Sequence, residues 1–250
     1  MQLTLLLVPL FFLGLTSAAA LPLEPAPELK NLDPAFLSRL EDLFAHPEHY
    51  DKNAITPAVA ARGLTTTRND MFPCRPILTL FARGTYELGN IGAQIGAPLF
   101  AALDALLPGQ TGMQGVQPYP ALVSGYLLAG SAIGAESLRT MLRTTTQKCP
   151  NTKIVVGGYS QGAQVVHRAL EGCDREIVKK VAAVVLFGDP EKGRRLGGGL
   201  EERGAVKTWC NVGDMICLGV PWPVGPHLEY KKTAAEAAAW IKGMVAQGGR

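Results

Sequence analysis

The sequence has few of the features that mark metalloproteins, nucleic-acid-binding proteins or membrane-spanning proteins. Its five cysteines form no CxxC pair, and its four histidines do not lie at zinc-finger spacing from them. The net charge is only +3, and no dense block of lysine or arginine favours nucleic acid. Beyond residue 20 no apolar run has the length that a transmembrane helix needs. We therefore expect no metal site, no nucleic-acid partner and no stable membrane insertion.

The first 20 residues have the pattern of a secretory signal peptide. Residues 3–15 are mostly apolar, and Ala18, Ala19 and Ala20 offer small residues for cleavage. The stretch lacks an early lysine or arginine, but it is too short to span a bilayer comfortably. We expect residues 1–20 to be a cleaved signal peptide and the rest to be a secreted, extracellular monomer. Disulfides are then the default, and one of the five cysteines has no partner.

From residue 77 onward, short apolar runs alternate with helical patterns. Hydrophobic residues make up 47% of the chain, enough for one sizeable core. We expect strands at residues 77–81, 154–156, 181–187 and 205–210, and helices at residues 91–107, 132–147, 161–170 and 233–245. This alternation predicts an α/β fold over residues 67–250. The fold is a single domain with a central, mostly parallel sheet flanked by helices on both faces.

A serine lies on a corner between one expected strand and the helix after it. Ser160 is the centre of the pattern G-x-S-x-G, between Gly158 and Gly162. A strand, this pattern and a helix in succession form a nucleophile elbow, whose strained turn raises the hydroxyl above the sheet. Glycine two places away on either side keeps Cβ atoms out of the crowded turn. The sequence therefore predicts Ser160 as a nucleophile.

A serine hydroxyl is a weak nucleophile and needs a base beside it. His167 lies seven residues further along the same helix, about 10 Å down its axis and out of reach. His46 and His49 belong to an N-terminal segment that nothing connects to Ser160. His227 follows the last expected strand, where α/β-hydrolases carry their base. We expect His227 to take the proton of Ser160, and His167 to be a residue of the helix face.

Two acidic residues are candidates for orienting the imidazole of His227. Asp189 and Asp214 both follow expected strands. Asp214 also lies between Cys210 and Cys217, which could close a small loop and fix the direction of the carboxylate. We expect Asp214 to be the acid and Asp189 to be a turn or cap residue. A serine, an acid and a histidine then follow one another in the chain order of α/β-hydrolases.

The reaction also needs donors for the oxyanion that develops on the substrate. The backbone N–H of Gln161 comes directly after the nucleophile, as in other elbows. Thr85, in the loop after the first expected strand, offers a second N–H and a hydroxyl. We expect Thr85 and Gln161 to form the oxyanion hole.

Three stretches of the chain resemble the fungal cutinase family. They are LFARGTYELGNIGAQIG, KCPNTKIVVGGYSQGAQ and CNVGDMICLGVPWPVGPHLEY, and the resemblance covers residues 67–246 in the family's order. It implies a secreted serine esterase with one α/β-hydrolase domain and no cofactor. The implied substrates are cutin, a plant polyester, and short-to-medium acyl esters. The implied catalytic residues are Ser160, Asp214 and His227.

The resemblance also implies a pairing of the cysteines. It places disulfides at Cys74–Cys149 and Cys210–Cys217 and leaves Cys173 as a partly buried thiol near the helix after the elbow. One departure concerns Thr85, because the best-known members carry serine there, and threonine keeps a hydroxyl donor.

A second departure is an N-terminal extension over residues 21–66. Residues 33–46 show a helical pattern with five apolar side chains on one face, and residues 21–62 carry seven acidic and four basic side chains. We hypothesise that this extension is either a propeptide or disordered arm, or a lid helix that covers the active site.

The substrate side leaves alternatives open. The apolar stretch 218–224, just before His227, suits a polymer or acyl chain if it is exposed, and otherwise packs within its loop. One alternative function is an acetylxylan esterase or another small-ester carboxylesterase. An alternative of another class is a non-catalytic secreted binding or effector protein.

Overall fold

The computed structural model describes residues 65–221, 223 and 225–247. Its centre is a five-stranded sheet with strand order β2-β1-β3-β4-β5, in which each neighbouring pair is parallel. The strands are β1 (Ile77–Ala82), β2 (Thr111–Gly115), β3 (Lys153–Tyr159), β4 (Val181–Phe187) and β5 (Val206–Trp209). Because the strands are parallel, all their carboxyl ends lie along one edge, where open α/β sheets hold their sites.

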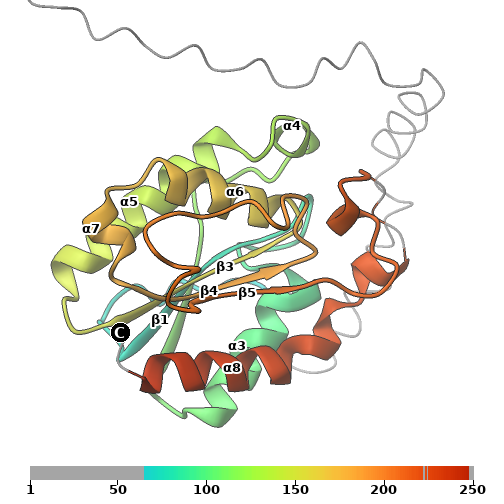
Figure 1. Cartoon of the computed structure of the whole chain (residues 1–250). Coiled ribbons are helices and arrows are strands. Elements are labelled where there is room, and N and C mark those ends of the chain that lie inside the picture. The colour runs from blue at the N-terminus through green and yellow to red at the C-terminus, as the bar shows by residue number, and fades with distance from the viewer. Residues whose placement is uncertain (1–64, 222, 224, 248–250) are drawn as a thin grey trace, which may run out of the picture.

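Helices cover both faces of this sheet, as Figure 1 shows. The helices α5 (Ala132–Lys148), α6 (Gln161–Glu171) and α7 (Arg175–Val178) lie on one face, and α3 (Ala97–Leu106) and α8 (Ala234–Ala246) lie on the other. A buried apolar cluster fills each of the two layers. A strand covered on both faces needs apolar residues at every position, as the unbroken run of β4 has. The predicted α/β fold is therefore confirmed.

Strand β2 is a part of the sheet that the sequence pattern does not predict. Its five residues, TGMQG, include two glycines and only one large apolar side chain, Met113. The strand is nevertheless buried, because β1 pairs with one edge and the segment before β1 covers the other. There the amide of Asp70 donates to Met113 O at 3.2 Å, and Gly115 donates to Arg68 O at 3.0 Å. This strand forms because of its pairing with neighbouring segments, and not because its residues have a high β-propensity.

Both expected disulfides are present. Cys74–Cys149 joins the segment before β1 to the end of α5, and Cys210–Cys217 closes a short loop after β5. Cys173 is free and half-buried just after α6, and burial raises the pKa of its thiol. Within the described ranges, no helix is both long and apolar enough to cross a bilayer. The expected signal peptide and the helix at 33–46 lie outside the described residues.

Candidate active site

Ser160 lies on the turn between β3 and α6 with a left-handed backbone, φ 54° and ψ −119°. Such a φ is strained for a residue with a side chain, and such strain collects at active sites. The turn is too crowded for side chains on its flanks. A Cβ on Gly158 would overlap the carbonyl of Gly162, and one on Gly162 would overlap the carbonyl of Ala82. These close approaches explain the glycine on either side of the serine.

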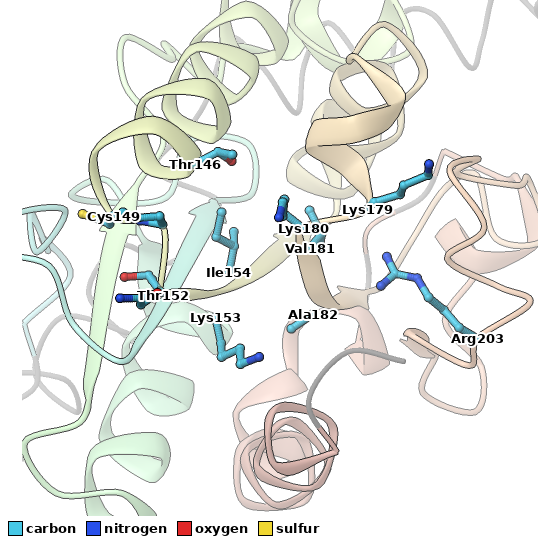
Figure 2. Close-up of a pocket in the computed structure, with 12 residues that line it drawn as sticks. Thr146, Cys149, Thr152, Lys153, Ile154, Lys179, Lys180, Val181, Ala182 and Arg203 are labelled. Carbon is cyan, nitrogen blue, oxygen red and sulfur yellow. The ribbon is translucent and has the colours of Figure 1, made fainter.

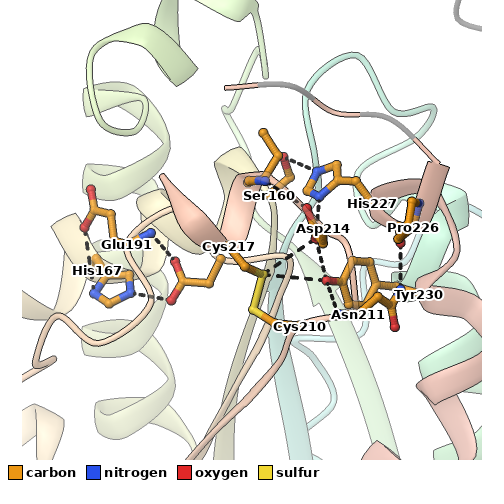
Figure 3. The surroundings of a disulfide bond; sticks show 12 residues. Ser160, His167, Glu191, Cys210, Asn211, Asp214, Cys217, Pro226, His227 and Tyr230 are labelled. Atoms are coloured by element: carbon orange, nitrogen blue, oxygen red, sulfur yellow. Dashed lines mark hydrogen bonds and ion pairs between the residues drawn. A yellow bond between two sulfur atoms is a disulfide. The ribbon is translucent and has the colours of Figure 1, made fainter. Parts of the chain in front are cut away.

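The three residues expected to act together are connected by hydrogen bonds (Figure 3). His227 Nε2 lies 3.0 Å from Ser160 Oγ, and His227 Nδ1 lies 2.8 Å from Asp214 Oδ2. All three residues are buried, with exposed fractions of 7% for Ser160, 2% for Asp214 and 1% for His227. A serine, an imidazole and a carboxylate in this arrangement can move a proton from the hydroxyl to the ring.

The loop after β5 fixes the carboxylate of Asp214. The Cys210–Cys217 disulfide brackets it, and the amide of Ile216 donates to Asp214 Oδ1 at 3.0 Å. Burial by itself would raise the pKa of Asp214. Hydrogen bonds from His227, Tyr230 and Ile216, together with the charge of His227, outweigh burial and lower that pKa. Because its pKa lies below the ordinary value of 3.8, Asp214 carries a negative charge beside the imidazole at neutral pH.

Two tyrosines that the sequence alone does not single out hold Asp214 and His227 in place. The Tyr230 hydroxyl donates to Asp214 Oδ2 at 2.6 Å and accepts the amide of Asn211 at 3.0 Å. Burial, and next the contact with Asp214, raise the pKa of Tyr230, so its hydroxyl keeps the proton it donates. The Tyr159 hydroxyl donates to His227 O at 2.8 Å, and its ring stacks on the imidazole. Tyr230 follows His227 by only three residues, but spacing does not reveal where a hydroxyl points.

The two residues expected to form the oxyanion hole, Thr85 and Gln161, contact each other through their side chains. Gln161 begins α6, and its side-chain Nε2 donates to Thr85 Oγ1 at 2.9 Å and to Leu122 O at 2.7 Å. The Tyr119 hydroxyl lies 3.0 Å from Gln161 Oε1. Because Thr85 Oγ1 accepts from Gln161, the hydroxyl can still donate its own proton to another acceptor. The contact joins the loop of Thr85 to the start of the helix that follows Ser160.

A carboxylate that the sequence analysis also missed organises the Thr85 loop. Glu87 accepts the amides of Gly84, Ala93 and Gln94, each at 2.8 Å. Burial raises the pKa of Glu87, and the three amides and the charge of Arg83 oppose that rise. Glu87 thus holds the loop after β1, which contains Thr85, to the first residues of the helical segment Gly92–Gly96.

Asp189, the other candidate for the acid, does not reach His227. It is 1% exposed and lies 3.0 Å from Nε2 of His167, which is itself buried. Its other oxygen accepts the amide of Glu191 at 2.9 Å, which closes a turn after β4. The structure therefore brings Asp214 to His227 and leaves Asp189 with a different histidine.

A separate pocket lies at the opposite edge of the sheet, where β3 and β4 begin (Figure 2). Its volume is about 400 Å³, and its charged lining residues, Lys153, Lys179, Lys180 and Arg203, are all basic. It includes none of the residues around Ser160. Among the described residues, no cluster of three or more histidine, cysteine or acidic side chains could hold a metal ion.

The sequence model of the Cutinase family matches residues 73–245. The chain belongs to the cutinase family. It is 43% identical over 172 residues to cutinase CUT1 of Coprinopsis cinerea, a match that covers 69% of this chain and 85% of that protein. It is 42% identical over 183 residues to cutinase cut1 of Trichoderma harzianum, covering 73% and 71% of the two chains.

Solved structures agree with this assignment. A Trichoderma reesei cutinase in complex with a C11Y4 phosphonate inhibitor superimposes with a TM-score of 0.69 at 36% identity, covering 84% of this chain and 97% of that one. An acetylxylan esterase superimposes with a TM-score of 0.57 at 21% identity, which shows a shared fold only. A member of the cutinase family is a carboxylic ester hydrolase of the serine type. The expectation of a serine esterase is therefore confirmed.

Proposed function

We propose that this chain is a secreted cutinase that hydrolyses the ester bonds of cutin and of short-to-medium acyl esters. The observation that carries this proposal is the continuous hydrogen-bonded line from Ser160 through His227 to Asp214 at the carboxyl ends of the strands. Ser160 is the nucleophile, His227 the base and Asp214 the acid that orients the base.

The first half of the reaction forms an acyl-enzyme. As Ser160 Oγ attacks the ester carbonyl, its proton passes to His227 Nε2, and Asp214 stabilises the resulting imidazolium across the 2.8 Å contact. The carbonyl oxygen becomes an oxyanion, which accepts from the Gln161 amide and from Thr85. His227 then returns its proton to the departing alcohol oxygen. The products of this half are the free alcohol and an ester between the acyl group and Ser160.

Water completes the reaction by the same route in reverse. It gives a proton to His227 Nε2 and attacks the acyl carbonyl, and Ser160 recovers its proton when the acid leaves. Each step needs only the imidazole, the serine and the oxyanion donors. No metal or cofactor takes part in this scheme.

Exposed apolar side chains in two segments that contact Gln161 and Asp214 support a hydrophobic substrate. Leu122 lies in the segment whose carbonyl accepts from Gln161, and Leu218 follows the disulfide that brackets Asp214. Their exposed fractions are 48% and 69%, and Val220 is 40% exposed. Exposed apolar residues that gather around a site favour an apolar partner. Trp222 and Val224 of the same stretch lie outside the described residues.

The remaining expectations belong to the same proposal. Residues 1–20 are a signal peptide, residues 21–66 an extension and residues 67–250 the catalytic domain of an extracellular monomer. The two disulfides support an oxidising compartment. The hypothesis that residues 33–46 form a lid is tested with a variant that begins near Thr65. Its activity on a soluble ester is compared with that of the longer chain, with and without detergent. Equal responses of the two forms to detergent would exclude it.

A chain-length series of chromogenic esters, followed by an assay on cutin, tests the proposed substrates. We expect turnover of butyrate and longer esters and release of hydroxy fatty acids from cutin, all abolished in Ser160→Ala. Activity on acetyl esters alone would indicate an acetylxylan esterase or a similar enzyme. No turnover of any ester by the folded chain would favour the non-catalytic binding protein.

A further inference from the structure

A second buried histidine–carboxylate pair lies outside the group of Ser160, His227 and Asp214. His167 on α6 and Asp189 after β4 have side chains only 2% and 1% exposed, with Nε2 and Oδ2 3.0 Å apart. Figure 3 shows His167 next to Glu191 and apart from Ser160 and His227. No hydrogen bond connects His167 to the catalytic residues, so it takes no part in the proton transfer.

The pair belongs to a small network that joins α6 to the turn after β4. Glu191 Oε2 lies 3.8 Å from His167 Nδ1 and accepts from Arg194 at 2.8 Å. Arg194 also reaches Glu171, at the end of α6, at 2.6 Å. The turn is therefore held to α6 at two places, one buried and one at the surface.

The residue before Asp189 packs directly against the catalytic base. Gly188 has φ +53°, and a Cβ placed on it would lie 2.7 Å from Cε1 and 2.8 Å from Nδ1 of His227. Its amide donates to Trp209 O at 3.0 Å. The carbonyl of Phe187, one residue earlier, accepts the amide of Ser160 at 2.9 Å. The backbone at 187–188 thus touches both the nucleophile and the base.

The position of Asp189 depends on His167. A buried carboxylate without a partner is costly, and the amide of Glu191 is its other hydrogen-bond donor. Without the histidine, the turn has to shift so that the carboxylate meets water or another donor. Because Asp189 directly follows Gly188, such a shift also moves Gly188, which packs against the imidazole of His227.

We propose that His167 is a positioning residue for ester hydrolysis, which acts through Asp189 and Gly188 to hold His227 in line with Ser160. This inference rests on the proposed function, because it assumes that His227 is the base. The pair contributes geometry only, so its loss changes the chemical step and leaves substrate binding unaffected. A misplacement of about 1 Å at a catalytic group costs up to about 100-fold in rate.

Two substitutions at position 167 separate this role from simple packing. His167→Leu removes the donor to Asp189, whereas His167→Gln keeps an amide donor on a side chain of similar reach. For His167→Leu we expect kcat on a soluble ester to fall about 10- to 100-fold with KM within about twofold. His167→Gln recovers most of the loss. Asp70→Ala, which removes the ion pair with Arg68 and the acceptor of the Met113 amide at the β2 edge of the sheet, is the control and lowers stability without lowering kcat.

The double variant His167→Leu/Asp189→Leu decides the matter if the single variant does not fold. Removing both polar partners leaves neither one buried without the other, so folding returns, but kcat stays low because the turn has lost its buried contact with α6 and keeps only the surface contact between Arg194 and Glu171. A kcat equal to that of the wild type in folded His167→Leu or in the double variant would overturn the inference, and so would a His167→Gln variant as impaired as His167→Leu. Absence of Ser160-dependent turnover in the wild type would instead overturn the proposed function.

Discussion

His227 and Asp214 are held 2.8 Å apart although neither residue lies on an α-helix or a β-strand. Asp214 lies in a loop and His227 in the short 3₁₀ helix Gly225–Leu228, and hydrogen bonds between these two segments replace the rigidity that a longer element would give. One is the hydrogen bond from Tyr230 to Asp214, and another is the bond from Asn211 Nδ2 to Pro226 O at 2.7 Å. The direction of the His227 imidazole therefore depends on contacts that can be removed one at a time.

Replacing the acid tests whether Asp214 orients the base. In Asp214→Asn we expect kcat to fall by about 10⁴-fold with little change in KM, because an amide favours the wrong imidazole tautomer. The folded pKa of Asp214 lies below its ordinary value of 3.8, so the carboxylate stabilises the fold above that pH. The free energy of unfolding of the wild type should accordingly exceed that of Asp214→Asn by less and less as the pH falls below 3.8. Steady-state kinetics and denaturant unfolding measure the two effects, and a fall in kcat of less than tenfold would exclude this role.

Tyr230→Phe removes a donor from the same carboxylate and leaves the ring. A hydrogen bond to a charged group contributes about 1.5–3 kcal/mol, so both stability and kcat should fall. The pKa of Asp214 should rise, because one of the hydrogen bonds that lower it is gone. Carboxyl titration by NMR follows this change. An unaltered Asp214 titration would show that the tyrosine only fills space.

The two disulfides should have different effects when each is replaced by a pair of serines. Cys74 and Cys149 are 75 residues apart, so their loss costs about 4–5 kcal/mol of stability and leaves the kcat of the folded enzyme unchanged. Cys210 and Cys217 are only seven apart, so their loss costs about 2–3 kcal/mol but releases the loop of Asp214 and lowers kcat. Denaturant unfolding and kinetics on the same samples provide the comparison. Equal losses of kcat in the two variants would contradict the proposed role of the short loop.

Glu87→Gln tests the carboxylate beneath the oxyanion loop. An amide group cannot accept all three N–H groups, so the Thr85 loop shifts and kcat falls about tenfold, less than the loss of a whole oxyanion donor. The folded pKa of Glu87 lies above its ordinary value of 4.5, so the folded state binds the extra proton. Wild-type stability relative to the variant should therefore decrease as the pH rises from 4.5 through the raised pKa.

Glu136→Gln is the matched control for that variant. Its side chain is 58% exposed and pairs with Arg139 on α5, so the exchange should leave kcat unchanged. Unfolding at a series of pH values, together with kinetics, distinguishes the two sites. A stability difference for Glu87→Gln that grows in favour of the wild type with rising pH would be inconsistent with a raised pKa.

The parts of the site that are local in sequence could be predicted from it. The elbow around Ser160 is one continuous pattern, and the helix and strand beside it have clear periodicity. Asp214 could be preferred to Asp189 because two cysteines bracket it. The structure supports the distinction for a further reason, since Asp189 faces a different histidine.

The contacts that the sequence does not reveal all depend on side-chain direction or tertiary pairing. Glu87 looks like an ordinary loop acid, and only the folded chain brings the amides of Ala93 and Gln94 to it. His167 lies apart from Ser160 in Figure 3, but its helical position in the sequence does not reveal that it is buried against Asp189. Strand β2 has no apolar pattern of its own, so it becomes visible only through its pairing with β1.

Stoichiometric labelling by a phosphonate ester tests the central claim most directly, because the reagent reports the nucleophile and its activation in one measurement. We expect one equivalent to attach to Ser160 in the wild type, none in Ser160→Ala, and a rate at least about 10³-fold lower in His227→Ala. Mass spectrometry of the intact chain and of its peptides measures extent and position. Labelling at another residue, or labelling of Ser160 at the wild-type rate without His227, would contradict the mechanism.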